Sequence, residues 1–159
     1  MRRTSLSRHL LAGAVAGAAG TTVLNTITYL DMAVRGRPAS VLPEQAAEKI
    51  AEGLHADLGD ERTAPPRNQG IGALMGLLSG VAVGAAYGLF RHAVREVSLP
   101  AAAGGLGAAA AVAGSAPLVG LGLTDPRTWG ANGWLTDLVP HLGYGLAAAG
   151  AYELAVSRR

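Results

Sequence analysis

Four long apolar runs alternate with polar stretches along the chain, at about residues 9–30, 69–90, 99–123 and 136–156. Each run is long enough to cross a bilayer, because a transmembrane helix needs about 20 predominantly apolar residues. Lipid offers the backbone no hydrogen-bond partner, so the crossing segments of such a chain are expected to be helical. The pattern therefore predicts an all-α protein, an integral membrane bundle of four transmembrane helices that forms a single domain over residues 1–159.

The second run carries a glycine at every fourth position, a glycine ladder that we expect to act as a helix-packing seam. Its members are Gly72, Gly76, Gly80, Gly84 and Gly88. In water each interior glycine destabilises a helix by about 1 kcal/mol relative to alanine, whereas in a membrane small residues allow a neighbouring helix to approach closely. Positions four apart drift by about 40° per step around a helix of 3.6 residues per turn. The ladder therefore requires either one partner that crosses right-handedly or two neighbours that it contacts in turn.

Small residues in the other runs match this ladder. Suitable partners are Gly13 and Gly17 in the first run, and Gly143, Ala147 and Ala151 in the last. The sequence leaves two uses of the ladder open. It can pack helices within one chain, or it can form a seam with a second copy or with another membrane protein.

A polar segment at residues 31–68 separates the first two runs, and Asp31 is expected to end the first helix. Within this segment an apolar stripe at helical spacing predicts a short amphipathic helix over about residues 43–58. Pro43 suits its first turn, and Gly59 suits the position after its end. The polar side of this helix is acidic, which does not favour binding to a lipid surface. We expect it to form an external cap over the mouth of the bundle.

Arginine placement predicts the orientation, because short cytoplasmic segments of membrane proteins are rich in Lys and Arg. Arginines gather at both termini and in the second connection, as Arg2, Arg3, Arg8, Arg91, Arg95, Arg158 and Arg159. Both termini are therefore expected in the cytoplasm, with residues 31–68 on the outside. Twelve arginines against one lysine, in a chain rich in alanine and glycine, indicate a GC-rich bacterial genome and hence a bacterial inner membrane.

The first run also has an interpretation as a signal peptide. Arg2 and Arg3 precede it, and residues 16–18 (Ala-Gly-Ala) resemble a cleavage site. The apolar run continues beyond that point to Tyr29, and this length favours an uncleaved first helix.

Polar side chains recur at one depth of the first and last runs. They form a candidate ligand-binding set of Asn25, Asp31, Asp137, His141 and Tyr144. The last three are spaced i, i+4 and i+7, so they share one face of a helix. A carboxylate one turn from an imidazole suits a proton-sensitive or ligand-orienting site, and ionisable groups at membrane depth are candidates for function. The alternative is structural, because polar contacts between membrane helices commonly hold a bundle together.

Glu153 lies near the inner end of the last run, where the helix dipole disfavours a carboxylate. A pair with Arg91, Arg95 or the terminal arginines is expected to compensate for this, and we interpret Glu153 as structural.

Composition excludes several classes of function. Cysteine is absent from the sequence, so disulfides and thiolate metal sites are excluded. The other histidines, His9, His55 and His92, lie on different predicted elements from His141, so no metal site is expected. The net charge is +2, but the arginines lie at the ends of apolar runs rather than on one face. This distribution argues against binding of nucleic acid. Because phosphate-binding, hydrolase and zinc-protease motifs are missing, we predict neither a catalytic residue nor a cofactor.

Residues 120–126 (GLGLTDP) precede a Trp-containing connection, and His141 is followed by Tyr144 and Gly145. In these strings and in its layout the chain resembles small uncharacterised bacterial inner-membrane proteins with four Ala/Gly-rich helices, among them the YagU-like proteins. The resemblance implies the same four-helix layout. It implies no established reaction, and no site residue is carried over from it.

The leading functional prediction is a non-enzymatic structural or partner-supporting membrane protein that assembles through its glycine ladder. Its partners would be the lipid bilayer and either a second copy or another membrane protein. The alternative is a protein that binds or transports a small ligand, or that responds to protons. Such a protein would use an outward-facing polar pocket between the first and fourth predicted helices.

Overall fold

The computed structural model describes residues 5–94 and 96–157. Five of the arginines that predict the orientation lie outside the described residues: Arg2, Arg3, Arg95, Arg158 and Arg159. The described residues form five α-helices and a short 3-10 helix without any strand, which confirms the all-α prediction. In chain order they are α1 (Leu6–Arg35), α2 (Leu42–Gly53), α3 (Ala64–Ala93), α4 (Leu99–Gly120), η1 (Pro126–Thr128) and α5 (Ala131–Ser157).

Three helices in the described part of the chain, α1, α3 and α4, are long and apolar enough to cross a membrane. The prediction of four transmembrane helices is therefore wrong in number, because α5 is not among them. At 27 residues α5 has the necessary length. Asp137, His141 and Glu153 lie within it, however, and ionisable side chains are unfavourable in hydrocarbon.

α1 continues beyond Asp31, where the sequence predicts its end. The Asp31 carboxylate lies 2.7 Å from the Arg35 guanidinium one turn later, and such an i, i+4 pair stabilises the added turn. Gly36 then adopts a left-handed φ of 64°, a conformation that commonly ends helices.

α2 ends at Gly53, before the predicted boundary, whereas α3 begins at Ala64, ahead of the predicted start at residue 69. Two prolines fit the first turn of α3, where a missing N–H group leaves no helical hydrogen bond unmade. Asp60 organises the turn before α3, because its carboxylate accepts hydrogen bonds from the Thr63 hydroxyl (2.8 Å) and the Thr63 amide (3.0 Å). These hydrogen bonds hold the pKa of the Asp60 carboxyl below its usual value.

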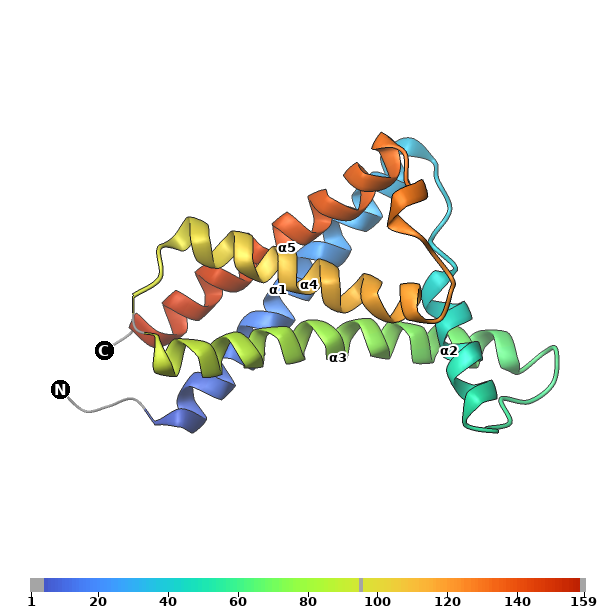
Figure 1. Ribbon diagram of the computed structural model, residues 1–159, viewed down its shortest axis with the longest axis horizontal. Coiled ribbons are helices and arrows are strands. Elements are labelled where there is room, and N and C mark those ends of the chain that lie inside the picture. The colour runs from blue at the N-terminus through green and yellow to red at the C-terminus, as the bar shows by residue number, and fades with distance from the viewer. Residues whose placement is uncertain (1–4, 95, 158–159) are drawn as a thin grey trace.

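The helices cross rather than forming a regular parallel bundle (Figure 1). α1 crosses α3 and is followed along its length by α5, while α4 packs on α5. α2 lies against the first part of α3 and also reaches the end of α4, where the Lys49 ammonium donates to the Leu121 carbonyl at 2.8 Å. The start of α1 and the end of α5 lie together, because the Arg8 guanidinium donates to the Ala155 carbonyl at 3.3 Å.

The core consists mainly of alanine. Its buried apolar members include Ala16, Ala102, Leu106, Ala148 and Ala149. Two tyrosines of α5, Tyr144 and Tyr152, are the largest fully buried side chains among the described residues. With such small side chains, adjacent helices approach until their backbones touch, so backbone atoms supply much of the contact between helices.

Candidate functional site

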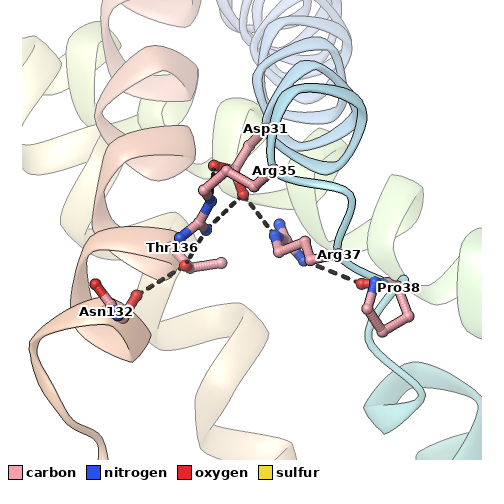
Figure 2. Close-up of polar contacts among 6 residues, drawn as sticks. All are labelled: Asp31, Arg35, Arg37, Pro38, Asn132 and Thr136. Carbon is pink, nitrogen blue, oxygen red and sulfur yellow. Dashed lines mark hydrogen bonds and ion pairs between the residues drawn. The ribbon is translucent and has the colours of Figure 1, made fainter.

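Asp31, a predicted site residue, lies at a polar corner where α1 ends and α5 begins (Figure 2). Its carboxylate is 2.7 Å from Arg35 Nε and 2.5 Å from Arg37 Nε. Arg35 Nη2 also donates to the Thr136 hydroxyl at 2.9 Å, which ties α1 to α5. Charge-assisted hydrogen bonds of this kind are roughly twice as strong as neutral ones. The carboxylate is thus engaged in holding the corner, and a ligand would have to displace two arginines from it.

Tyr144, a second predicted site residue, lies in the core and not at a polar surface. Its side chain is fully buried, and its hydroxyl donates to the Gly80 carbonyl of α3 at 2.6 Å. The ring also packs against α1, since a Cβ atom added at Gly20 would lie 2.7 Å from Tyr144 Cδ2. Tyr144 therefore joins three helices, α5, α1 and α3.

Asp137 and His141 form a partly buried pair on α5. His141 Nδ1 lies 2.7 Å from the Asp137 carbonyl oxygen and 3.6 Å from its carboxylate. The imidazole faces α4, because its Nε2 atom would lie 3.7 Å from a Cβ atom added at Gly114. Asn25, the remaining predicted residue, is exposed on α1. The five candidates are thus divided among the corner, the core, the α4–α5 contact and the outer surface, and they do not line a common pocket between α1 and α5.

The last three glycines of the ladder, Gly80, Gly84 and Gly88, contact α1. A Cβ atom at Gly84 would lie 2.6 Å from both Cα and N of Gly17, and one at Gly13 would lie 3.0 Å from Cα of Gly88. Gly80 lies against the Thr21 side chain, whose hydroxyl donates back to the Gly17 carbonyl at 2.9 Å. On α1, Gly13 and Gly17, which the sequence suggested as partners, lie against this part of the ladder together with His9 and Thr21.

The first two glycines of the ladder, Gly72 and Gly76, do not contact α1. Gly72 lies against α2, since a Cβ atom there would be 2.8 Å from the Pro43 carbonyl group. Gly76 has open space where its Cβ would be. The ladder therefore serves two neighbours in turn, one of the two arrangements that its angular drift allows. Gly143 is a predicted partner that packs elsewhere, against Val23 and Ile27 of α1.

A second polar cluster, whose members are far apart in the sequence, joins α1, α3 and α5 near the start of α1. We call it the histidine–tyrosine cluster; it comprises His9, Tyr87, Arg91, His92, Tyr152 and Glu153. The Arg91 guanidinium forms an ion pair with the Glu153 carboxylate and donates to the Tyr87 hydroxyl at 3.0 Å. This confirms that Glu153 pairs with an arginine, and it identifies Arg91 among the predicted alternatives.

Aromatic contacts complete the histidine–tyrosine cluster. His9 Nδ1 and the Tyr152 hydroxyl are hydrogen-bonded at 2.5 Å, and the His9 and His92 rings meet edge to face with centroids 5.3 Å apart. The Arg91 guanidinium carbon lies 5.3 Å from the Tyr152 ring centroid, within the range of a cation–π interaction. The sequence signal was weak, because His9 and Tyr152 are 143 positions apart.

The chemistry of these groups is that of internal pairing. Within residues 5–94 and 96–157, no group of three or more His, Asp or Glu side chains is placed to hold a metal ion. The Asp31 and Glu153 carboxylates lie beside guanidinium groups, and the Asp137 carboxylate lies beside an imidazole. The tyrosine hydroxyls contact a backbone carbonyl, an imidazole or a guanidinium group. Such pairs fix helices relative to one another, because a buried polar group is costly unless it is hydrogen-bonded.

Comparison of the chain with models of protein families, with curated proteins and with solved structures finds no match. The resemblance to the YagU-like proteins therefore stays a prediction.

Proposed function

We propose that this chain is a non-enzymatic integral membrane protein of the bacterial inner membrane, with both termini in the cytoplasm. Three helices with the length and apolarity of membrane spans support a membrane location. The Arg8–Ala155 hydrogen bond brings the two ends of the described chain together, which supports placing both on one side. With three apolar spans, this placement requires α5 to return through the bilayer as a fourth, less apolar crossing packed on α1 and α4. Arg91 of α3 belongs to the same end through its ion pair with Glu153, in agreement with the positive-inside rule.

Within this membrane role, we propose that the protein supports a second copy or another membrane protein by helix packing at Gly76. The observation that carries this proposal is the difference between Gly76 and the rest of the ladder. The four other ladder glycines are covered by α1, α2 or Tyr144 of the same chain, whereas Gly76 is open. Ala73 and Leu77, its neighbours on the outer side of α3, are exposed too. A foreign helix could approach closely there without displacing any part of the fold.

Replacing Gly76 by leucine is the test of this proposal. We expect Gly76→Leu to abolish a defined oligomer or a co-purifying protein complex, because the isobutyl group would fill the place of the foreign helix. The measurement is native mass spectrometry after purification in mild detergent. Gly105→Leu is the matched control, since Gly105 is also open but lies on α4. A wild-type protein that is monomeric and unaccompanied, or an assembly that survives Gly76→Leu, would overturn the proposal.

A second candidate function is a proton-responsive role centred on Asp137 and His141. The observation that favours it is their partly buried pairing at the α4–α5 contact, with 3.6 Å between imidazole and carboxylate. A proton gained or lost by the imidazole would change the charge beside the carboxylate and so alter this contact. Asn25, Asp31 and Tyr144 do not belong to this narrower site.

For this second candidate we expect His141→Ala to abolish a pH-dependent change in tryptophan fluorescence, because the group that gains or loses the proton is removed. Trp134 is a suitable reporter, because it lies one turn before Asp137 on α5. His55→Ala is the control, since His55 is exposed between α2 and α3. If the wild type and His141→Ala follow the same curve, the proton-responsive role is excluded, while assembly through Gly76 is unaffected by that result.

A further inference from the structure

A hollow of about 350 Å³ lies between the start of α1 and the end of α5. Its lining is Ser7, Arg8, Leu11, Ala12, Val15 and Ala155. The lining residues of α1 are spaced so that they share one face of that helix. One end of the hollow is thus polar and basic, and the rest is apolar.

The charge of this end of the molecule favours an anionic occupant. The Arg8 guanidinium donates one hydrogen bond to the Ala155 carbonyl. Because a guanidinium has five N–H groups, other donors remain for a phosphate. Basic surfaces next to membrane helices attract anionic lipid on the cytoplasmic side.

The apolar part of the hollow favours an acyl chain. Leu11 and Val15 are 67% and 63% exposed, although they are large aliphatic side chains. They follow Arg8 along α1 over roughly 10 Å, at a rise of 1.5 Å per residue, which is most of the depth of one leaflet's hydrocarbon. Ala12 and Ala155 add only methyl groups and leave room between the two helices. A headgroup at Arg8 would therefore place its hydrocarbon chain over Leu11 and Val15.

We propose that this hollow, with Arg8 at its mouth and Leu11 and Val15 along its wall, is a binding site for an anionic phospholipid. Arg8 binds the headgroup phosphate, and the α1–α5 groove holds one acyl chain. This inference rests on the proposed membrane location but not on assembly through Gly76.

The test uses the full chain in nanodiscs that contain equal amounts of phosphatidylcholine and phosphatidylglycerol, followed by native mass spectrometry of the released protein. We expect phosphatidylglycerol to be retained in preference to phosphatidylcholine. Arg8→Gln is expected to lower that preference about fivefold, the change expected from one arginine at an anionic surface. Arg127→Gln removes the same charge from the connection between α4 and α5, where the side chain is 92% exposed, and is expected to keep the preference.

Ala155→Trp tests the contribution of the groove separately from that of the Arg8 charge. It fills the hollow while Arg8 remains, and we expect it to reduce phosphatidylglycerol retention as well. Unchanged retention in both Arg8→Gln and Ala155→Trp would overturn the proposal, as would equal retention of the two lipids by the wild type. Competition by glycerol phosphate as effective as that by the lipid would assign the site to a free anion instead. Resistance of the protein to carbonate extraction is measured in parallel, because a protein that leaves the membrane fraction contradicts the proposed membrane location itself.

Discussion

Gly84→Leu is expected to prevent the native packing of α1 on α3. A Cβ atom at this position would lie 2.6 Å from both Cα and N of Gly17, far inside van der Waals contact. The obstacle is backbone and not the end of a flexible side chain, so it cannot move without shifting the whole of α1. Since α1 also contacts α5 along its length, such a shift would disturb both helix pairs.

The loss of stability caused by a side chain at position 84 is measurable with alanine, the smaller substitution. We expect Gly84→Ala to lower the free energy of unfolding by about 3 kcal/mol, the upper part of the range for overpacked cores. Gly76→Ala is the matched control on the same helix, where no atom lies within 4 Å of the new methyl group. That control should leave stability unchanged or raise it by up to about 1 kcal/mol, because alanine favours helices over glycine.

The measurement is reversible unfolding in mixed detergent micelles, followed by circular dichroism. Equal stability of Gly84→Ala and Gly76→Ala would contradict the close α1–α3 contact. It would also contradict the packing of most of the glycine ladder within one chain.

Glu153→Gln is expected to destabilise the protein by about 2 kcal/mol, because the Arg91 guanidinium loses its carboxylate partner. Arg91 is the more buried of the two, with a side chain 9% exposed against 41% for Glu153. Breaking a fully buried pair costs about 3–5 kcal/mol, and the exposure of Glu153 reduces the expected value. The helix dipole disfavours a carboxylate near the end of α5, so removing the Glu153 charge recovers a few tenths of a kcal/mol of this lost stability.

A second ion pair provides the control. Asp125 and Arg127 are 3.7 Å apart, with side chains 52% and 92% exposed, so Asp125→Asn should leave the unfolding free energy unchanged. Adding Arg91→Gln to Glu153→Gln should recover part of the lost stability, because the charge without its carboxylate is then removed. If Glu153→Gln unfolds like the wild type, the histidine–tyrosine cluster does not hold α3 to α5.

Local features were predictable from residue type and spacing. Long apolar runs made helices the expected elements, and four-residue spacing of glycine marked α3 as a close-packing helix. The predicted charge pairing of Glu153 followed from its place near a helix end. The helices and the glycine spacing depend on residues within a few turns of one another, so the chain sequence carries that information directly. For Glu153 only the need for a nearby cation is local, because its partner Arg91 lies 62 positions away.

The candidate site was less predictable, because side-chain direction depends on the rotation of each helix. Asp137, His141 and Tyr144 share a broad face of α5, yet they meet different neighbours. Tyr144 reaches α3, and His141 faces α4. Two side chains three residues apart point about 60° away from each other around the helix axis. That angle is enough for one to enter the core and the other to face a different neighbouring helix. Sequence spacing alone therefore could not decide whether these groups converge.

The sequence by itself determined that the chain is helical and that the ladder permits close approach, but it predicted four membrane spans where only α1, α3 and α4 are apolar enough. Only the tertiary structure decided that Gly84 and Gly88 meet Gly13 and Gly17 and that His9 meets Tyr152. The physical reason is that hydrogen bonding and apolarity act along each helix, whereas partners across helices are selected by the crossing geometry. That geometry is set by all the small side chains of the core acting together.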